Sequence, residues 1–152
     1  MTERLSPTVN LTAVEATTLS AHRVATVLQH GNVRAVSAGI DVKAVANTEI
    51  ALGGAGTEHF CLSDISFMLT AIGAPALNGN CTVQIGTSVG GAEIAAAAPL
   101  TNLIALNSTF RWSFIGQMPT ILSNASIWIR VTIADTSAGT GTMVAYVAGD
   151  TF

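Results

Sequence analysis

The sequence is poor in charged residues. Only 10% of its 152 residues are Asp, Glu, Lys or Arg, whereas soluble domains average about 25%. The six basic residues and the net charge of −3 exclude the concentrated basic face that nucleic-acid binding requires. A surface with so few charges is weakly protected against association. We therefore expect it to be covered by other copies or by partners, the alternative being a monomer coated with Thr, Ser and Asn.

Long apolar runs and cysteine are also scarce. No stretch reaches the roughly 18–20 apolar residues of a membrane span, and Met1–Pro7 lacks the apolar core of a secretory signal. We therefore expect synthesis in a cytoplasm and no membrane partner. The two cysteines, Cys61 and Cys81, lie outside any Cys-x-x-Cys pair. This favours two buried, reduced thiols, with a disulfide between strands as the alternative.

Motifs for catalysis, phosphate binding and metal binding are missing. Gly53–Gly56 and Gly86–Gly91 lack the Gly-Lys-Ser/Thr of a phosphate loop and are expected to be turns. Gly86-Thr87-Ser88-Val89-Gly90 matches the pattern Gly-x-Ser-x-Gly, but no helix is expected after it, and a nucleophile elbow requires a turn from a strand into a helix. His59 and Cys61 share one face of a strand, and Cys81 is a third candidate ligand, whereas a structural zinc site needs about four. We expect no enzyme, no cofactor, no metal site and no small-molecule substrate.

From Val33 onward the sequence is typical of β-structure. Thr, Val and Ile are abundant, and Gly, Asn, Ser and Pro recur between apolar runs. No convincing helix separates the runs, which disfavours a parallel βαβ sheet. The pattern predicts an all-β fold, an antiparallel two-sheet β-sandwich of jelly-roll type. Strands are expected at 40–45, 49–52, 65–70, 81–85, 93–96, 110–114, 127–133 and 143–147, with a hairpin turn at Asn78-Gly79.

The clearest alternation runs through residues 127–133. Its period of two predicts a core row that faces the space between the sheets, together with apolar residues of two other strands. The predicted core positions are Ile127, Ile129, Val131, Ile133, Phe67, Leu69, Val83 and Ile85.

The same alternation turns Trp128 and Arg130 outward. An outward tryptophan indicates a contact surface. A subunit interface is favoured, because few polar or charged residues are expected around the aromatic side chains. The alternative is a sugar-binding platform that also uses Trp112 and Tyr146.

Residues 1–38 differ from the rest and are predicted to form an attachment arm, with the sandwich at 39–152. They hold three of the six basic residues, and their apolar residues recur loosely at helical spacing. Several β-branched residues weaken the helix prediction, so a partly helical arm and an extended arm are both open. A further alternative is that Val33–Ser37 forms an edge strand.

One family shares this style of sequence. Gly39–Ile50, the Phe-containing strand after it, Asn80–Thr87 and a β-branched closing strand resemble capsid decoration (cement) proteins of tailed bacteriophages. The resemblance covers roughly residues 33–150. It implies a jelly-roll homotrimer on the outside of the phage head, at or near three-fold positions, where it stabilises the shell.

The resemblance also implies a partner and a location. The N-terminal segment would clamp the major capsid protein, and the protein, made in the host cytoplasm, would reside on the capsid surface of the virion. The resemblance implies no catalytic residues, because this family has none that could be matched to positions of this sequence. The expected contacts with the capsid or a neighbouring subunit are Arg4, Val14, Leu19, Arg23, Val24, Leu28, Arg34, Trp128 and Arg130. Fibre-tip domains of phages have a similar sequence pattern, so the alternative is a receptor- or glycan-binding module of a phage tail fibre.

Overall fold

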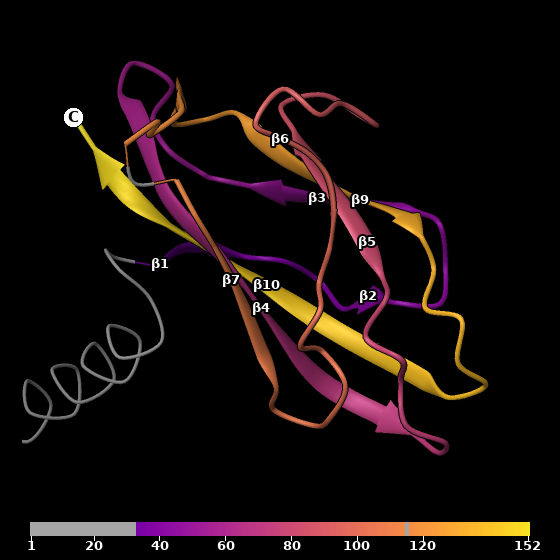
Figure 1. The fold of residues 1–152 in the computed structure, drawn as a ribbon. Coiled ribbons are helices and arrows are strands. Elements are labelled where there is room, and N and C mark those ends of the chain that lie inside the picture. Colours follow the sequence, from indigo (N-terminus) through magenta and orange to yellow (C-terminus); the bar gives the residue numbers. More distant parts are fainter. Residues whose placement is uncertain (1–32, 115) are drawn as a thin grey trace, which may run out of the picture.

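The computed structural model describes residues 33–114 and 116–152, and this part of the chain is all β (Figure 1). Within it, no helix is long and apolar enough to span a bilayer. The strands are β1 (Val33–Val36), β2 (Ile40–Asp41), β3 (Asn47–Ala51), β4 (His59–Gly73), β5 (Thr82–Gly86), β6 (Ala95–Pro99), β7 (Thr109–Ser113), β8 (Thr120–Leu122), β9 (Ser126–Ile133) and β10 (Thr140–Thr151).

Two antiparallel sheets pack face to face. Sheet A has the order β1-β10-β4-β7, with β2 also paired to β10 and β8 also paired to β4, and sheet B has the order β3-β9-β5-β6. In Figure 1, β4 and β10 of sheet A cross the molecule diagonally, and sheet B lies to the upper right. The predicted β-sandwich is confirmed.

The strand order is that of a jelly roll. Because β1 and β2 both pair with β10, and β7 and β8 both pair with β4, each couple is one interrupted strand. Counted in this way, the chain has eight strands in sequence order. The first pairs with the eighth, the second with the seventh, the third with the sixth and the fourth with the fifth. This is the pairing of one long hairpin folded over into two sheets.

Apolar side chains from both sheets fill the space between them. Phe67, Leu69 and Ile65 of β4 are fully buried, as are residues of β5 and β9. Of the predicted core row, seven positions are completely inaccessible to solvent and are confirmed: Ile127, Ile129, Val131, Phe67, Leu69, Val83 and Ile85.

The eighth predicted core residue, Ile133, is 55% exposed, so that prediction is wrong. Val83 pairs with Val131, but the preceding Thr82 pairs with Ile133. Thr132 is therefore an extra residue, a β-bulge. The bulge moves Ile133 to the outer face, where its partner Thr82 also points.

Three further local predictions differ from the structure. Asn78-Gly79 is not a hairpin turn, because β4 and β5 lie in different sheets and the connection crosses between them. The strand predicted at 40–45 ends at Asp41, and β3 already begins at Asn47. Strand β8 was not predicted, since three residues are too few to show an alternation.

The sandwich begins before residue 39. Strand β1 pairs with β10 at the edge of sheet A, which confirms the alternative that Val33–Ser37 is an edge strand. Ser37 fixes its end: its backbone N–H donates to the carbonyl of Ala145 at 2.9 Å, and its hydroxyl accepts the Ala145 N–H at 2.9 Å.

The bulge generates a matched pair of core variants. Ile129→Ala removes a fully buried side chain and should lower the free energy of unfolding by about 2–5 kcal/mol. Ile133→Ala, four residues away on the same strand, should change it by less than about 0.5 kcal/mol. Urea denaturation measures both, and equal losses would contradict the bulge.

Candidate interaction surface

The two described residues for which the sequence predicted outward contact, Trp128 and Arg130, lie on β9 in the middle of sheet B. They alternate with the fully buried Ile127, Ile129 and Val131. Side chains of successive strand residues point to opposite faces, so Trp128 and Arg130 face outward, as predicted. Both are half-buried.

Polar side chains surround this pair. Trp128 lies opposite Glu49 of β3 and Gly86 of β5, and Arg130 lies opposite Asn47 and Gln84. Directly opposed residues share a face of the sheet. The expectation of few polar neighbours around the aromatic side chain is therefore wrong for Trp128. The partners come from strands that are distant in the sequence.

The charges on this face are not paired with each other. Glu49 accepts a 2.5 Å hydrogen bond from the hydroxyl of Ser126 through its Oε1 atom. Arg130 has neither an ion pair nor a side-chain hydrogen bond within residues 33–114 and 116–152. A half-buried guanidinium beside a tryptophan is thus available for an incoming acceptor. We call Trp128, Arg130, Glu49, Asn47 and Gln84 the sheet B patch.

The Gly86–Gly91 stretch forms the turn of the β5–β6 hairpin, as predicted, next to this patch. It is built around the carboxylate of Glu93, which accepts bonds from the Ser88 hydroxyl at 2.7 Å and the Thr87 N–H at 3.0 Å. These bonds, first that of Ser88, lower the pKa of Glu93. Gln84 ties the turn to the sheet through the carbonyls of Gly90 and Gly91. The glycine-rich turn therefore folds around a carboxylate of the protein itself, that of Glu93.

Arg34, a further predicted contact residue, does not belong to the patch. Arg34 is exposed on β1, at the edge of sheet A. Arg4, Val14, Leu19, Arg23, Val24 and Leu28 lie outside the described residues.

The two other aromatic residues considered for sugar binding belong to sheet A. Trp112 pairs with the buried Ile65, packs against the core and meets Phe110 edge-on at 6.2 Å, so it offers no platform. Tyr146 pairs with Ser66 on the outer face of sheet A and is half-buried.

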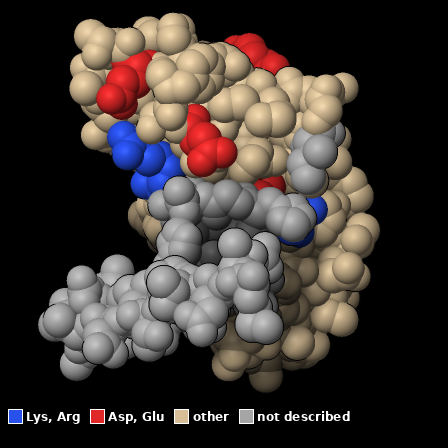
Figure 2. All heavy atoms as spheres, turned by 90° about the vertical axis from the view of Figure 1, so that its left-hand side faces the viewer, with Lys and Arg blue, Asp and Glu red and all other residues tan. Residues whose placement is uncertain are grey.

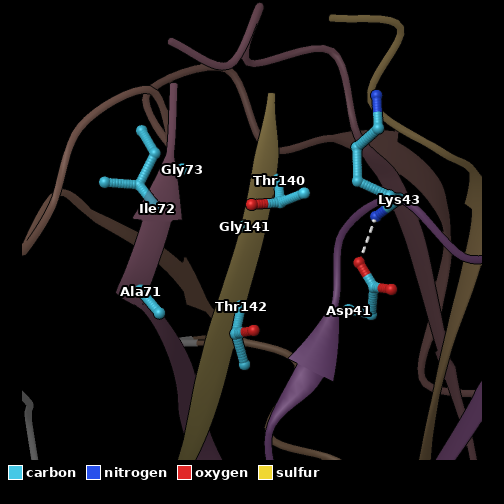
Figure 3. A pocket seen from close by; sticks show the side chains of 8 residues that line it. All are labelled: Asp41, Lys43, Ala71, Ile72, Gly73, Thr140, Gly141 and Thr142. Carbon is cyan, nitrogen blue, oxygen red and sulfur yellow. Dashed lines mark hydrogen bonds between the residues drawn. The ribbon is translucent and has the colours of Figure 1, made fainter. Parts of the chain in front are cut away.

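A pocket of about 290 Å³ lies where β10 passes between β4 and the β2 end (Figure 3). It is lined by Asp41, Lys43, Ala71, Ile72, Gly73, Thr140, Gly141 and Thr142. Asp41 accepts the backbone N–H of Lys43 at 2.8 Å, and the Lys43 side chain points away from it. The Lys43 ammonium binds the carbonyls of Asp135 and Ser137. Both charged groups are thus engaged with the backbone of the chain itself.

The candidate metal and thiol residues do not converge. Both cysteines are free thiols; the prediction of a buried, reduced thiol is confirmed for Cys81, whereas Cys61 is half-buried, so its predicted burial is wrong. Burial raises the pKa of Cys81 to about 11, with Asp135 and Asp41 adding to the effect, so this thiol stays protonated at neutral pH. His59 stacks on Phe152 at 5.9 Å. Among the described residues, no three His, Cys, Asp or Glu side chains form a group that could hold a metal ion.

Comparisons of the chain with protein-family models, with curated proteins and with solved structures found no match.

Asp135 holds three loops together at one end of the sandwich. Its carboxylate, 3% exposed, accepts backbone N–H bonds from Asn78, Asn80 and Ser137 at 3.2, 3.2 and 2.9 Å. Its own N–H donates to the carbonyl of Val42 at 2.8 Å. Burial alone would raise the pKa of Asp135, but the bonds from Ser137, Asn78 and Asn80 outweigh it and lower the pKa to about 2.

This lowered pKa predicts a pH-dependent contribution to stability. Because the folded pKa lies below the ordinary value of 3.8, the contribution is fully present above about pH 4 and is lost as the pH falls toward 2. Asp135→Asn should lower the free energy of unfolding by about 1–3 kcal/mol at pH 7, and the difference from the wild type should shrink between pH 4 and 2. Urea denaturation at several pH values measures it, with the exposed Asp150→Asn as control. A difference that does not change with pH would contradict the role of Asp135.

Proposed function

We propose that this chain is a structural protein of a tailed-bacteriophage virion, a decoration protein that binds the outside of the head as a homotrimer and stabilises the shell. The fold carries the proposal: a single jelly roll, an architecture used by viral capsid and lectin domains. Its sequence also resembles decoration proteins over roughly residues 33–150. The partners are the major capsid protein and further copies of the chain, and the proposed location is the capsid surface.

The scarcity of charge supports an assembly role. Among the described residues on the side of the molecule shown in Figure 2, Lys, Arg, Asp and Glu form a few small groups and most other side chains are uncharged. Several large apolar side chains are at least 45% exposed: Val36, Val45, Val89, Ile104, Leu106, Met118, Leu122, Ile133 and Phe152. A surface with few charges is weakly protected against association with other protein. A trimer bridging several capsid subunits would oppose their separation through linked contacts.

The sheet B patch is the described surface best suited to contact the capsid. Trp and Arg are the side chains most often responsible for binding energy at interfaces. Arg130 has no partner of its own in the described residues and would donate to a carboxylate of the shell. The proposed contact therefore combines apolar burial of Trp128 with one charge-assisted hydrogen bond.

One observation favours the second candidate, a glycan-binding module of a tail fibre. A tryptophan flanked by a carboxylate, two amides and a guanidinium can stack on a sugar ring while the polar groups bind hydroxyls. Both candidates use the same patch, so the ligand decides between them.

Binding to purified phage heads, compared with a glycan array, tests the proposal. The wild type should co-sediment with the heads and leave the array empty. Trp128→Ala should weaken head binding about 30-fold, the equivalent of about 2 kcal/mol for an interface hot spot. The matched control is Phe152→Ala, which removes an aromatic side chain that is 71% exposed outside the patch. Binding to glycans alone, abolished by Trp128→Ala, would replace the decoration proposal by the second candidate.

The N-terminal segment is proposed as the main clamp on the capsid, and β1 determines where it can be cut. A variant that starts at Val33 keeps β1 and its pairing with β10, so it should fold and lose head binding. A variant that starts at Gly39 also loses β1 and Ser37 and should unfold at a lower temperature. Circular dichroism and co-sedimentation measure the two effects. Full head occupancy by the variant that starts at Val33 would contradict the clamp.

A further inference from the structure

The outer face of sheet A differs in chemistry from the sheet B patch. Strand pairing aligns its outward residues in rows across β10, β4 and β7. One row is Tyr146, Ser66 and Arg111, and the next is Val144, Met68 and Thr109. Tyr146, Val144 and Met68 are half-buried. The centre of this face is thus aromatic and aliphatic.

The charges in these rows are already paired with each other. A third row holds Asp64, opposite Ala148 and Ser113. Asp64 is fully buried and accepts a bond from Nη2 of Arg111 at 3.1 Å, while the Arg111 side chain is 32% exposed. Burying a charge that is already paired costs less free energy than burying an unpaired charge. This face can therefore be covered by protein without leaving a charge alone, in contrast to Arg130 on sheet B.

We propose that the outer face of sheet A is the surface through which copies of this chain associate, turned toward the three-fold axis of the homotrimer. The proposal rests on the proposed function and assigns one sheet to self-association and the other to the capsid. The composition of this face fits a self-association surface, because Tyr, Met and Arg are enriched and unpaired charges are depleted in the centres of interfaces. The occupant is a second copy, since the one ion pair on this face is already neutralised, so equivalent faces of several copies can meet around an axis without charge repulsion.

The face is large enough for a stable interface. Strands β4 and β10 are paired from Phe60 to Gly73, and a stretch of twelve paired residues spans about 40 Å at 3.3 Å per residue. Four strands about 4.8 Å apart add a width of about 19 Å. The resulting area, roughly 750 Å², is divided between two neighbours in a trimer, and its total is close to the roughly 800 Å² that one partner contributes to a standard interface.

A lysine placed on this face tests the assignment. Met68→Lys in the full chain should weaken association at least about 100-fold, because like charges would meet near the axis. Thr109→Lys, on the exposed edge strand opposite Met68, places the same charge without altering a half-buried position. Ala97→Lys, exposed on β6 of sheet B, is the matched control. Analytical ultracentrifugation measures the mass and circular dichroism the fold.

The expected result is a wild type and an Ala97→Lys variant of about three times 15.5 kDa, with folded monomers for Met68→Lys and Thr109→Lys. If Met68→Lys fails to fold, Thr109→Lys decides. Trimers of both sheet A variants would overturn the assignment of the face while leaving the trimer intact. Dissociation of Ala97→Lys alone would assign association to sheet B. A monomeric wild type would overturn the inference, and head binding then reports separately on the proposed function.

Discussion

The pairing of β4 with β10 is the constraint on which the rest of the structure depends. These two longest strands occupy the centre of sheet A and are hydrogen-bonded from one end of the molecule to the other. β10 is the last strand along the chain and β4 belongs to its first half, so their pairing joins the two ends of the folded hairpin. The edge strands β1 and β7 attach to this central pair, and its outer side forms the face proposed for self-association.

Irregularities in the ladders decide which residues reach that face. In β4, Phe60 and Leu62 point inward, and so do Ile65, Phe67 and Leu69. The change from even to odd positions occurs at Ser63, where the register with β10 shifts. Without this bulge, Asp64 would enter the core and could not meet Arg111 at 3.1 Å. The β-bulge at Ser63 therefore places the buried carboxylate of Asp64 on the outer face of sheet A, where it forms an ion pair, instead of in the apolar core.

Most of the fold could be predicted because a period of two in a long strand has one interpretation. The buried Ile127, Ile129 and Val131 and the outward Trp128 follow from alternation alone. Ile133 does not, because an extra residue such as Thr132 leaves no mark in the pattern. The crossing of Asn78-Gly79 between sheets was missed for a related reason: the turn residues indicate a reversal without saying which strand comes next.

The candidate site could be predicted only in part. That Trp128 and Arg130 share an outward face is local information. Their neighbours Glu49, Asn47 and Gln84 lie dozens of residues away, and only the strand register brings them there. Trp112 was considered for the surface, but its pairing with Ile65 turns it inward. The role of Asp135, which binds the N–H groups of Asn78 and Asn80, also depends on contacts between distant loops.

We propose separate roles for the two sheets: sheet A contacts other copies of the chain, and sheet B, together with the N-terminal segment, contacts the shell. Both roles require that the chain lies on the outside of a phage head. Cryo-electron microscopy of purified heads saturated with the full chain is the decisive measurement. We expect jelly-roll density outside the shell at or near three-fold positions, with sheet B toward the capsid and sheet A toward the three-fold axis. A bare head surface at saturating protein would contradict it.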